Sequence, residues 1–404
     1  MKSRFKNLAK YALSCIRRYK VRTLVILVCL GIAASVFSSI SFLKDGLIAE
    51  GELSLKYAPD LTVQGLSAGR QYFIDTRYAG FIRSIEGIKR VEPRVWGYGN
   101  IGNTLLVIVG VDPNTVNASA GTTSTTPYPL EAGSFLSPQG SGMVVIGKGV
   151  SDLLGAKVGS VLSMLSESNE VFQYFVVGVF NSESTIYSAD MILMSIGDAR
   201  EFFDIGEDRA SDLAVYLNDV EPSSYNSVLN QVARRISAIT NSRVLTKDVV
   251  LKAQETTYGA RSGYFSVTWY IILIAVAIVA FNQTVVVGHE SKFEVGLLKA
   301  LGFSTTDVIQ VRLIESLILG ALAASIGLTF GIIYDVVLNA PILRDFMLGW
   351  ATLYPNFAVP TFISAQTVFL TYAVTIVPLL FATVIPSWVN ATVDPDIAMR
   401  GAIA

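Results

Sequence analysis

The sequence predicts a membrane protein with four transmembrane α-helices, arranged as one plus three, and a large α+β extracytoplasmic domain after the first helix. Apolar residues make up 51% of the 404 residues and charged residues only 16%, whereas ordinary globular chains carry roughly 25% charged residues. Four uncharged runs reach the roughly 20 residues that a helix needs to cross a bilayer. Between the first and second run, short strand-like and helix-like segments alternate instead.

Residues 1–22 precede the first run and are strongly basic. Their apolar side chains recur at helical spacing, at Phe5, Leu8, Ala12, Cys15 and Ile16. This pattern predicts an amphipathic helix that lies on the inner membrane face, held by apolar burial and by attraction to anionic lipid. A merely basic, frayed N-terminus is the alternative.

Residues 23–43 form the first uncharged run and predict the first transmembrane helix. The run is longer than the 7–15 apolar residues of a signal-peptide core, which favours an uncleaved anchor over a cleaved signal peptide. The basic residues before it place the N-terminus in the cytoplasm by the positive-inside rule. With four crossings, both termini lie in the cytoplasm of a multi-pass protein of the cell inner (plasma) membrane.

Residues 44–262 are predicted to form the extracytoplasmic α+β domain. Runs rich in β-branched and aromatic residues predict strands over 105–109, 143–146, 175–179 and 213–217. Helical periodicity predicts helices over 76–86 and 223–240. Strands interleaved with helices indicate an α+β fold. The short strands and glycine turns within 130–178 further suggest a small barrel-like insert, and hence two lobes.

Residues 263–404 contain the other three predicted transmembrane helices, at about 265–288, 313–337 and 360–388. The last includes Pro378 and Pro386, which membrane helices tolerate when neighbouring groups satisfy the freed carbonyls. None of the spans shows a polar stripe suited to lining a hydrophilic path.

The residues needed for catalysis are missing from the sequence. The single histidine, His289, adjoins the second span, so neither a Ser-His-Asp triad nor a His/Cys metal site is expected in the external domain. Residues Gly142–Gly149 nearly match a phosphate-binding loop, but Gly149 replaces the Ser or Thr that would bind magnesium. We therefore expect no catalytic residue, metal or cofactor in this chain, and no nucleic-acid partner.

The segment between the second and third spans predicts a short cytoplasmic helix. Phe293, Leu297 and Leu301 share one face, and Gly302 is placed to end the helix in a left-handed conformation. A capping box over Ser304–Asp307 would then start the third span. Such a helix can dock in the groove of a cytoplasmic partner; a plain surface connector is the alternative.

Several motifs resemble those of the FtsX/MacB-type ABC transporter permeases. Phe293–Gly302 resembles the family's E-I-G-x-L-K-A-L-G signature, and Arg17–Leu24 resembles the basic entry to its first span. Ile314–Leu317 resembles its third-span pattern, and Asp394–Arg400 its C-terminal tail. Residues 145–159 resemble part of its external core domain.

The resemblance implies a dimer of permease chains, each docking a cytoplasmic ATPase that holds ATP and magnesium. The coupling segment would consist of Phe293, Glu294, Val295, Gly296, Leu297, Lys299, Ala300, Leu301 and Gly302. It would pass motion to the external domain and so export or extract a hydrophobic or amphipathic cargo, such as a lipoprotein, peptide, glycolipid or drug. A periplasmic adaptor is a candidate further partner. The alternatives are a regulator of a cell-wall hydrolase, and a receptor or scaffold without transport; the size of the external domain favours transport.

Glu315 is an acidic residue near the inner end of the third span. Acids within spans mark functional sites by default. Glu315 lies, however, in the first turns of its helix, where the helix dipole favours negative charge, and Arg312 is placed to pair with it. A structural role is therefore favoured.

Overall fold

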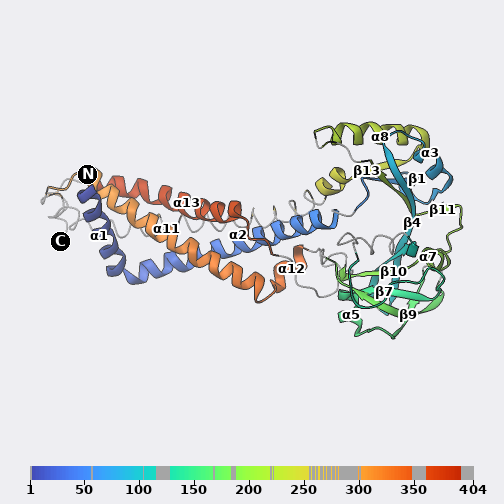
Figure 1. Ribbon diagram of the computed structural model, residues 1–404. Coiled ribbons are helices and arrows are strands. Elements are labelled where there is room, and N and C mark those ends of the chain that lie inside the picture. The colour runs from blue at the N-terminus through green and yellow to red at the C-terminus, as the bar shows by residue number, and fades with distance from the viewer. Residues whose placement is uncertain are drawn as a thin grey trace. The chain divides into compact units, whose positions relative to one another are not determined.

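The computed structural model describes two compact units of the chain. It covers residues 2–55, 58–102, 104–114, 128–166, 169–182, 188–218, 221, 223–253, 256, 260, 263, 267, 270, 274, 278, 281, 299, 302–347 and 361–392. The helical unit comprises Met1–Gly46, Tyr258–Met347 and Thr361–Ala404, and the β-rich unit comprises Leu47–Thr257 and Leu348–Pro360. Each is described by itself (Figure 1).

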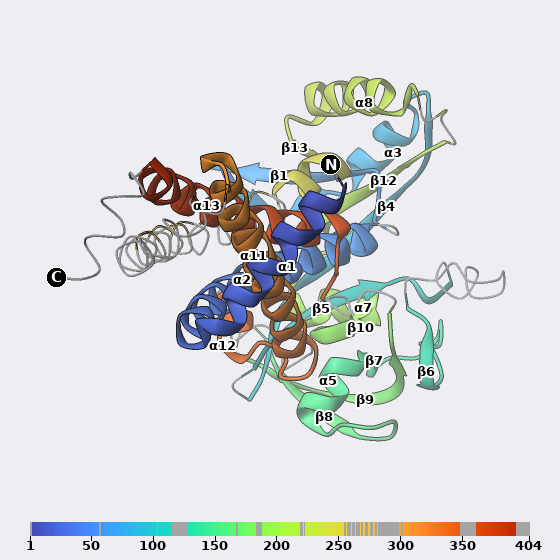
Figure 2. The same ribbon diagram turned by 90° about the vertical axis from the view of Figure 1, so that its left-hand side faces the viewer.

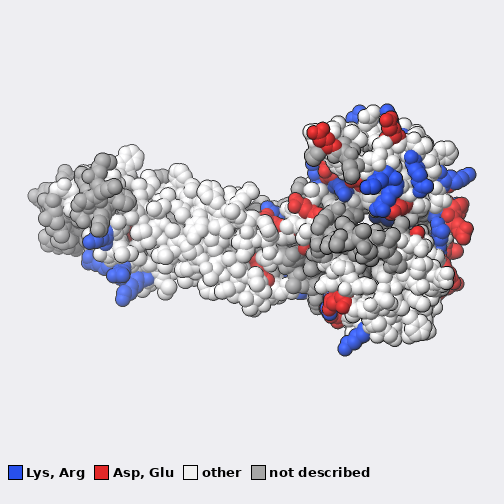
Figure 3. Space-filling view, in the orientation of Figure 1, with Lys and Arg blue, Asp and Glu red and all other residues white. Residues whose placement is uncertain are grey.

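The helical unit is built from long apolar helices. Its described helices are α1 (Lys2–Arg18), α2 (Lys20–Leu55), α11 (Thr305–Val336), α12 (Pro341–Met347) and α13 (Ala365–Thr392). Among the described residues, three helical segments are long and apolar enough to cross a membrane: Thr23–Leu55, Thr305–Val336 and Ala365–Val389. Figure 3 shows their surface almost free of charge on the face drawn, with Lys and Arg gathered near α1.

These segments confirm three of the four predicted spans. The fourth, at about 265–288, lies largely outside the described residues; those described within it, Val267, Tyr270, Ile274, Ile278 and Phe281, are helical. Two helices extend beyond the uncharged runs that predict them. The third span was placed at about 313, but α11 begins at Thr305, and α2 continues to Leu55. The difference arises because charged residues end a membrane-compatible run without ending a helix.

Small residues bring α2 and α11 together at backbone distance. A Cβ atom added to Gly327 would lie 2.5 Å from the Cβ of Ala34 and 2.7 Å from the carbonyl oxygen of Gly31. Close approach at small residues is how membrane helices gain van der Waals contact, since lipid tails are as apolar as leucine. Toward the N-terminal end of α2, Ile26 and Leu30 pack with Leu319, Ala323 and Leu379, which joins α13 to the pair.

The apolar face of α1 lies against α11. Leu8 and Ala12 are buried with Val311, and Ile314 packs beside them. The predicted amphipathic helix is therefore present, but part of the stripe expected to enter the lipid headgroup layer is covered by protein. An α11 that begins eight residues earlier than expected provides the surface for this contact.

One lobe of the β-rich unit is an antiparallel sheet covered by helices. Its strands run in the order β13 (Arg243–Thr246), β1 (Leu61–Ser67), β12 (Asp212–Leu217) and β4 (Ile88–Ile101), and β2 (Arg70–Tyr72) pairs with β1. Helices α3 (Arg77–Arg83) and α8 (Tyr225–Thr240) provide Ile82, Leu229, Val232 and Ile236 to the core on this sheet. A short pair, β3 (Ile74–Asp75) and β11 (Arg209–Ala210), lies beside it.

The other lobe is a closed barrel. Its strands follow the order β4, β5 (Thr104–Val111), β10 (Met191–Ser195), β7 (Met143–Gly147), β9 (Val171–Phe180) and β8 (Val161–Leu165), and β8 returns to β4 at Asn100 and Leu165. Strand β6 (Leu130–Gly133) pairs with β9, and helices α5 (Lys148–Leu154) and α7 (Ile196–Phe203) follow β7 and β10. The two lobes and the helices that accompany them are also visible in Figure 2.

The predicted barrel-like insert is correct in kind and wrong in extent. Residues 130–178 supply only part of the barrel, because β4, β5 and β10 come from outside that range. The predicted strands at 105–109, 143–146, 175–179 and 213–217 all lie within observed strands, and the helices at 76–86 and 223–240 correspond to α3 and α8. The α+β class of this domain is confirmed.

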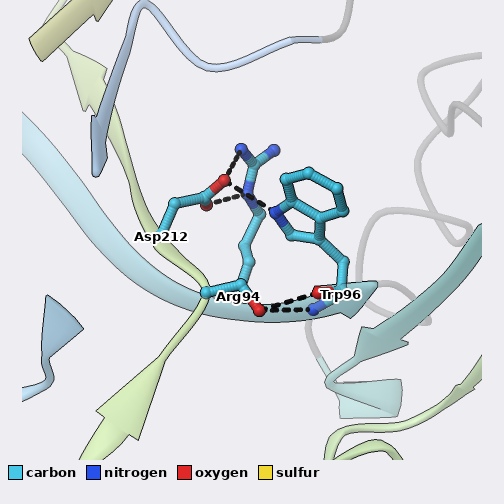
Figure 4. Close-up of polar contacts among 4 residues, drawn as sticks. Arg94, Trp96 and Asp212 are labelled. Atoms are coloured by element: carbon cyan, nitrogen blue, oxygen red, sulfur yellow. Dashed lines mark hydrogen bonds and ion pairs between the residues drawn. The ribbon is translucent and has the colours of Figure 1, made fainter. Parts of the chain in front are cut away.

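Strand β4 belongs to both lobes, and a polar cluster fixes the point where it changes partner. Its first half pairs with β12 and its second half with β5. There Asp212, 1% exposed, accepts hydrogen bonds from Arg94 Nε at 2.7 Å and from Trp96 Nε1 at 2.8 Å (Figure 4). Ser211 donates to the Trp96 carbonyl at 2.8 Å. Such a partly buried hydrogen-bonded cluster favours one conformation of the strand.

Candidate functional site

The predicted coupling segment is described only at its end. Phe293, Glu294, Val295, Gly296, Leu297, Ala300 and Leu301 lie outside the described residues. Lys299 is helical, and the N–H of Gly302 donates to the Lys299 carbonyl at 2.9 Å. Gly302 has φ +93°, the left-handed region that favours glycine. The helix that holds Lys299 therefore ends where the sequence indicated.

The start of α11 follows at once. The N-cap residue Ser304 accepts a hydrogen bond from the N–H of Asp307 at 3.3 Å, and its own N–H donates to the Asp307 carboxylate at 2.9 Å. This reciprocal pair is the predicted capping box. Four residues, 300–303, lie between Lys299 and the N-cap residue Ser304. The connection between the two helices is therefore short.

An ion pair reinforces the same end of the helical unit. Arg312 Nη1 lies 2.8 Å from Glu315 Oε2, and the Glu315 side chain is 2% exposed. The pairing that favoured a structural role for Glu315 is therefore present. The hydroxyl of Thr23 on α2 donates to the carbonyl of Ile16 on α1 at 3.1 Å. Together with the apolar α1–α11 contact, these bonds join the C-terminal end of α1 to the N-terminal ends of α2 and α11.

A row of buried polar side chains runs along α13, where the sequence indicated no polar stripe suited to lining a hydrophilic path. Thr367, Thr371, Thr375, Thr383 and Ser387 recur at helical spacing and are all at most 8% exposed. Thr371 and Thr375 donate to carbonyls of their own helix at 2.8 and 2.7 Å, and Thr383 accepts from Ser316 at 3.0 Å. Leu379 interrupts the row. The row therefore joins helices rather than lining a continuous hydrophilic path, and the four-residue recurrence was the signal that could have revealed it.

At the opposite end of the helical unit, Asp45 joins α2 to the start of α13. Its Oδ2 accepts hydrogen bonds from the hydroxyls of Ser364 and Thr367, both at 2.7 Å. Lys44 lies 3.2 Å from its Oδ1. These contacts explain why α13 begins at Ala365, after Ser364, rather than at residue 360. Sequence reasoning missed this cluster because its members are more than 300 residues apart.

A second missed acid, Asp335, lies buried near the end of α11. Its side chain is 2% exposed, and the hydroxyl of Ser39 on α2 donates to its Oδ1. Its Oδ2 has no hydrogen-bonding partner among the described residues. The sequence signal was an aspartate directly after an uncharged run, where it was counted only as the end of that run.

The near-match to a phosphate-binding loop forms a strand and a helix instead. Residues 143–147 are β7, and Lys148 at the start of α5 pairs with Glu131 at 3.0 Å. That hydrogen bond raises the pKa of Lys148 above its ordinary value. A Cβ on Gly147 or Gly149 would collide with the backbone of Ser188 or Ala189, so these glycines serve chain packing. Among the described residues, no group of three or more His, Cys, Asp or Glu side chains is placed to hold a metal.

Comparisons with known proteins agree with the two units. The MacB-like periplasmic core domain family matches residues 23–239, and the FtsX-like permease C-terminal family matches residues 266–393. An uncharacterised ABC transporter permease of Methanocaldococcus jannaschii is 24% identical over 218 residues, 53% of this chain and 53% of that relative. The chain thus matches about half the length of the curated relative.

Solved structures of low similarity also match. The periplasmic region of MacB from Actinobacillus actinomycetemcomitans is 13% identical, covers 50% of this chain and 95% of its own, and has a TM-score of 0.33. The extracellular domain of the noncanonic ABC-type transporter YknZ from Gram-positive bacteria is 11% identical, covers 46% and 97%, and has a TM-score of 0.32. TM-scores this low add no weight to the family matches. With one family covering more than half of its length and the other most of the remainder, the chain belongs to the FtsX/MacB-type family of ABC transporter permeases.

Proposed function

We propose that this chain is the permease subunit of an ABC transporter in the cell inner membrane, with both termini in the cytoplasm. It couples ATP hydrolysis by a separate cytoplasmic ATPase to movement of its extracytoplasmic domain. The chain itself is not catalytic, and it works as a dimer with a second permease chain. Through this movement it exports or extracts a hydrophobic or amphipathic cargo.

The observation that carries this proposal is the junction before α11. The helix holding Lys299 ends at Gly302 in a left-handed conformation, and the Ser304–Asp307 capping box begins α11 immediately afterwards. A partner that moves the coupling segment therefore acts on α11 through a short connection of defined geometry. A long, unstructured connection would absorb such a movement.

Contacts of α11 support the next step of the proposed coupling. Its inner end packs against Leu8 and Ala12 of α1, and its middle meets α2 at Gly327. Helix α2 then continues without interruption to Leu55, so its last turns belong to the β-rich unit. Movement of α11 is thereby expected to be shared with α2 and passed along a continuous helix.

The described spans offer a hydrophilic solute little to bind. Large apolar side chains are exposed along them, as contact with lipid requires, including Ile32 on α2, Phe330 on α11 and Phe381 on α13. The buried threonines of α13 are hydrogen-bonded within the helices and interrupted by Leu379. A hydrophilic solute would need a continuous polar path, and the described part of the chain favours movement of the outer domain instead.

A pull-down in mild detergent tests the proposal. We expect the tagged chain to co-purify with an ATPase in a fixed ratio, and Leu297→Asp to lose both that partner and the coupled ATPase activity. The charge would disrupt an apolar docking face while leaving membrane insertion intact. Leu153→Asp is the matched control, since Leu153 is exposed on α5 of the β-rich unit at 39%. If Leu297→Asp retains the ATPase, the docking assignment is wrong; if the native chain recovers none, a receptor or scaffold is favoured.

A further inference from the structure

Asp335 is a carboxyl group buried within the helical unit, and no positive charge pairs with it among the described residues. Its Oδ1 accepts from the Ser39 hydroxyl, and its Oδ2 is buried with no hydrogen-bonding partner among the described residues. None of the ion pairs found among those residues includes it. Ionisable residues in membrane helices are costly, face the interior of the bundle, and mark ion or proton sites.

Oxygen atoms of α2 lie against α11 one turn before Asp335 as well as at Asp335 itself. Gly331, one turn before Asp335, lets the helices approach so closely that an added Cβ would lie 3.1 Å from the Ser35 carbonyl oxygen and would collide with the Ser38 hydroxyl. Ser38 and Ser39 are at most 1% exposed. Phe42, one turn farther along α2, is also fully buried.

Charged groups on the packed elements do not neutralise Asp335. On α2 the nearest are Lys44 and Asp45, five and six residues beyond Ser39, or about 8 Å farther along the axis at roughly 1.5 Å per residue. They are paired with each other at 3.2 Å, and Asp45 also binds Ser364 and Thr367. Helix α13 contains no charged residue. On α11 the adjacent Tyr334 accepts from the Ile342 N–H, and α12 carries Arg344.

We propose that Asp335 and Ser39 form a binding site for one small monovalent cation, either a proton or Na⁺, between α2 and α11. A buried carboxylate left uncompensated destabilises the folded state, and a single positive charge offsets that destabilisation. Carboxylate, hydroxyl and carbonyl oxygens are the ligands that hard cations prefer. The bound cation holds the two helices together beyond Gly331, so the α2–α11 contact responds to the activity of that cation.

The test uses the full chain in lipid nanodiscs and does not involve an ATPase, so its result is independent of the proposed transport function. The melting midpoint is measured against Na⁺ at constant ionic strength, with choline as the replacement, and against pH without Na⁺. We expect the midpoint to rise with one of these cations. Asp335→Asn, which keeps the shape but not the charge, should remove the Na⁺ dependence or, for the proton, reduce the pH dependence to that contributed by the chain's other titrating groups. Asp45→Asn, at an acid already satisfied by its neighbours, should retain the dependence of the native chain.

Infrared spectra identify the cation. A protonated-carboxyl stretch present in the native chain and absent from Asp335→Asn assigns the proton; its absence, with one Na⁺ bound per chain, assigns sodium. If Asp335→Asn does not fold, Ser39→Ala serves, with an expected loss of about fivefold in cation affinity for one lost hydrogen bond. The proposal is overturned if the native chain shows neither signature, or if the cation dependence is unchanged in every variant that folds.

Discussion

Two buried aspartates of the β-rich unit show how neighbouring hydrogen-bond donors determine the free-energy cost of burying a charged carboxylate. Asp212 is surrounded by donors, with Arg94 and Trp96 both bonded to its carboxylate. Asp190, 8% exposed, accepts a hydrogen bond from its own backbone N–H, with no other donor to its carboxyl group found among the described residues. Burial therefore raises the pKa of Asp190 from 3.8 to about 6, since the charged form loses more solvation than that one hydrogen bond replaces.

The pH dependence of stability should follow from Asp190. Its pKa is higher in the folded than in the unfolded chain, so between about pH 4 and pH 6 the folded state binds more protons. The contribution of Asp190 to the free energy of unfolding is therefore largest below about pH 4 and is lost as the pH rises toward 6. At 1.36 kcal/mol per pKa unit, the loss amounts to up to about 3 kcal/mol. Asp190→Asn should flatten the decline in melting midpoint between about pH 4.5 and pH 7. Thermal melts of both proteins in a series of buffers over this range measure the decline. Asp152→Asn, at an exposed position, is the control and should not; an unchanged slope in Asp190→Asn would refute the assignment.

At the scale of elements, the two glycines at the contact between α2 and α11 differ in how much space a side chain would find there. A Cβ on Gly327 meets Ala34 at 2.5 Å, whereas a Cβ on Gly31 finds its nearest neighbour, Ile326 Cγ2, at 3.7 Å. We expect Gly327→Ala to separate the helices and cost about 2 kcal/mol, a typical overpacking penalty. Gly31→Ala, on the facing helix, should be neutral or slightly stabilising because alanine favours the helix. Melting midpoints of both variants in one detergent check this; equal midpoints would show that the helices do not pack as described.

The sequence predicted those elements whose signals are local. The strand at 143–146 and the cap at Ser304–Asp307 need only neighbouring residues, and both were found where expected. Contacts between distant segments were missed: β8 closes the barrel on β4 through Asn100 and Leu165, and Ser39 meets Asp335 across 296 positions. No periodicity encodes such pairings. For the coupling segment, the docking residues stay a prediction from the sequence, and the described part adds only how the segment ends at Gly302.

At the scale of the whole molecule, the number of crossings decides on which side of the membrane each segment lies. The three described spans follow from uncharged runs, and the crossing at about 265–288 stays a prediction. If it crosses, residues 44–262 and the coupling segment lie on opposite sides. If it does not, they share a side, and an ATPase cannot reach the coupling segment while the β-rich unit lies outside.

Single-cysteine labelling separates these cases in a background where Cys15→Ser and Cys29→Ser remove both native thiols. Ser84→Cys reports on the β-rich unit, where Ser84 caps α3 at the surface, and Phe303→Cys reports on the junction before α11, where Phe303 is 39% exposed. With a membrane-impermeant maleimide on intact spheroplasts, we expect Ser84→Cys to react and Phe303→Cys to react only after permeabilisation. Reaction of both in intact spheroplasts would remove the second crossing, and the reverse pattern would invert the orientation that the basic N-terminus predicts.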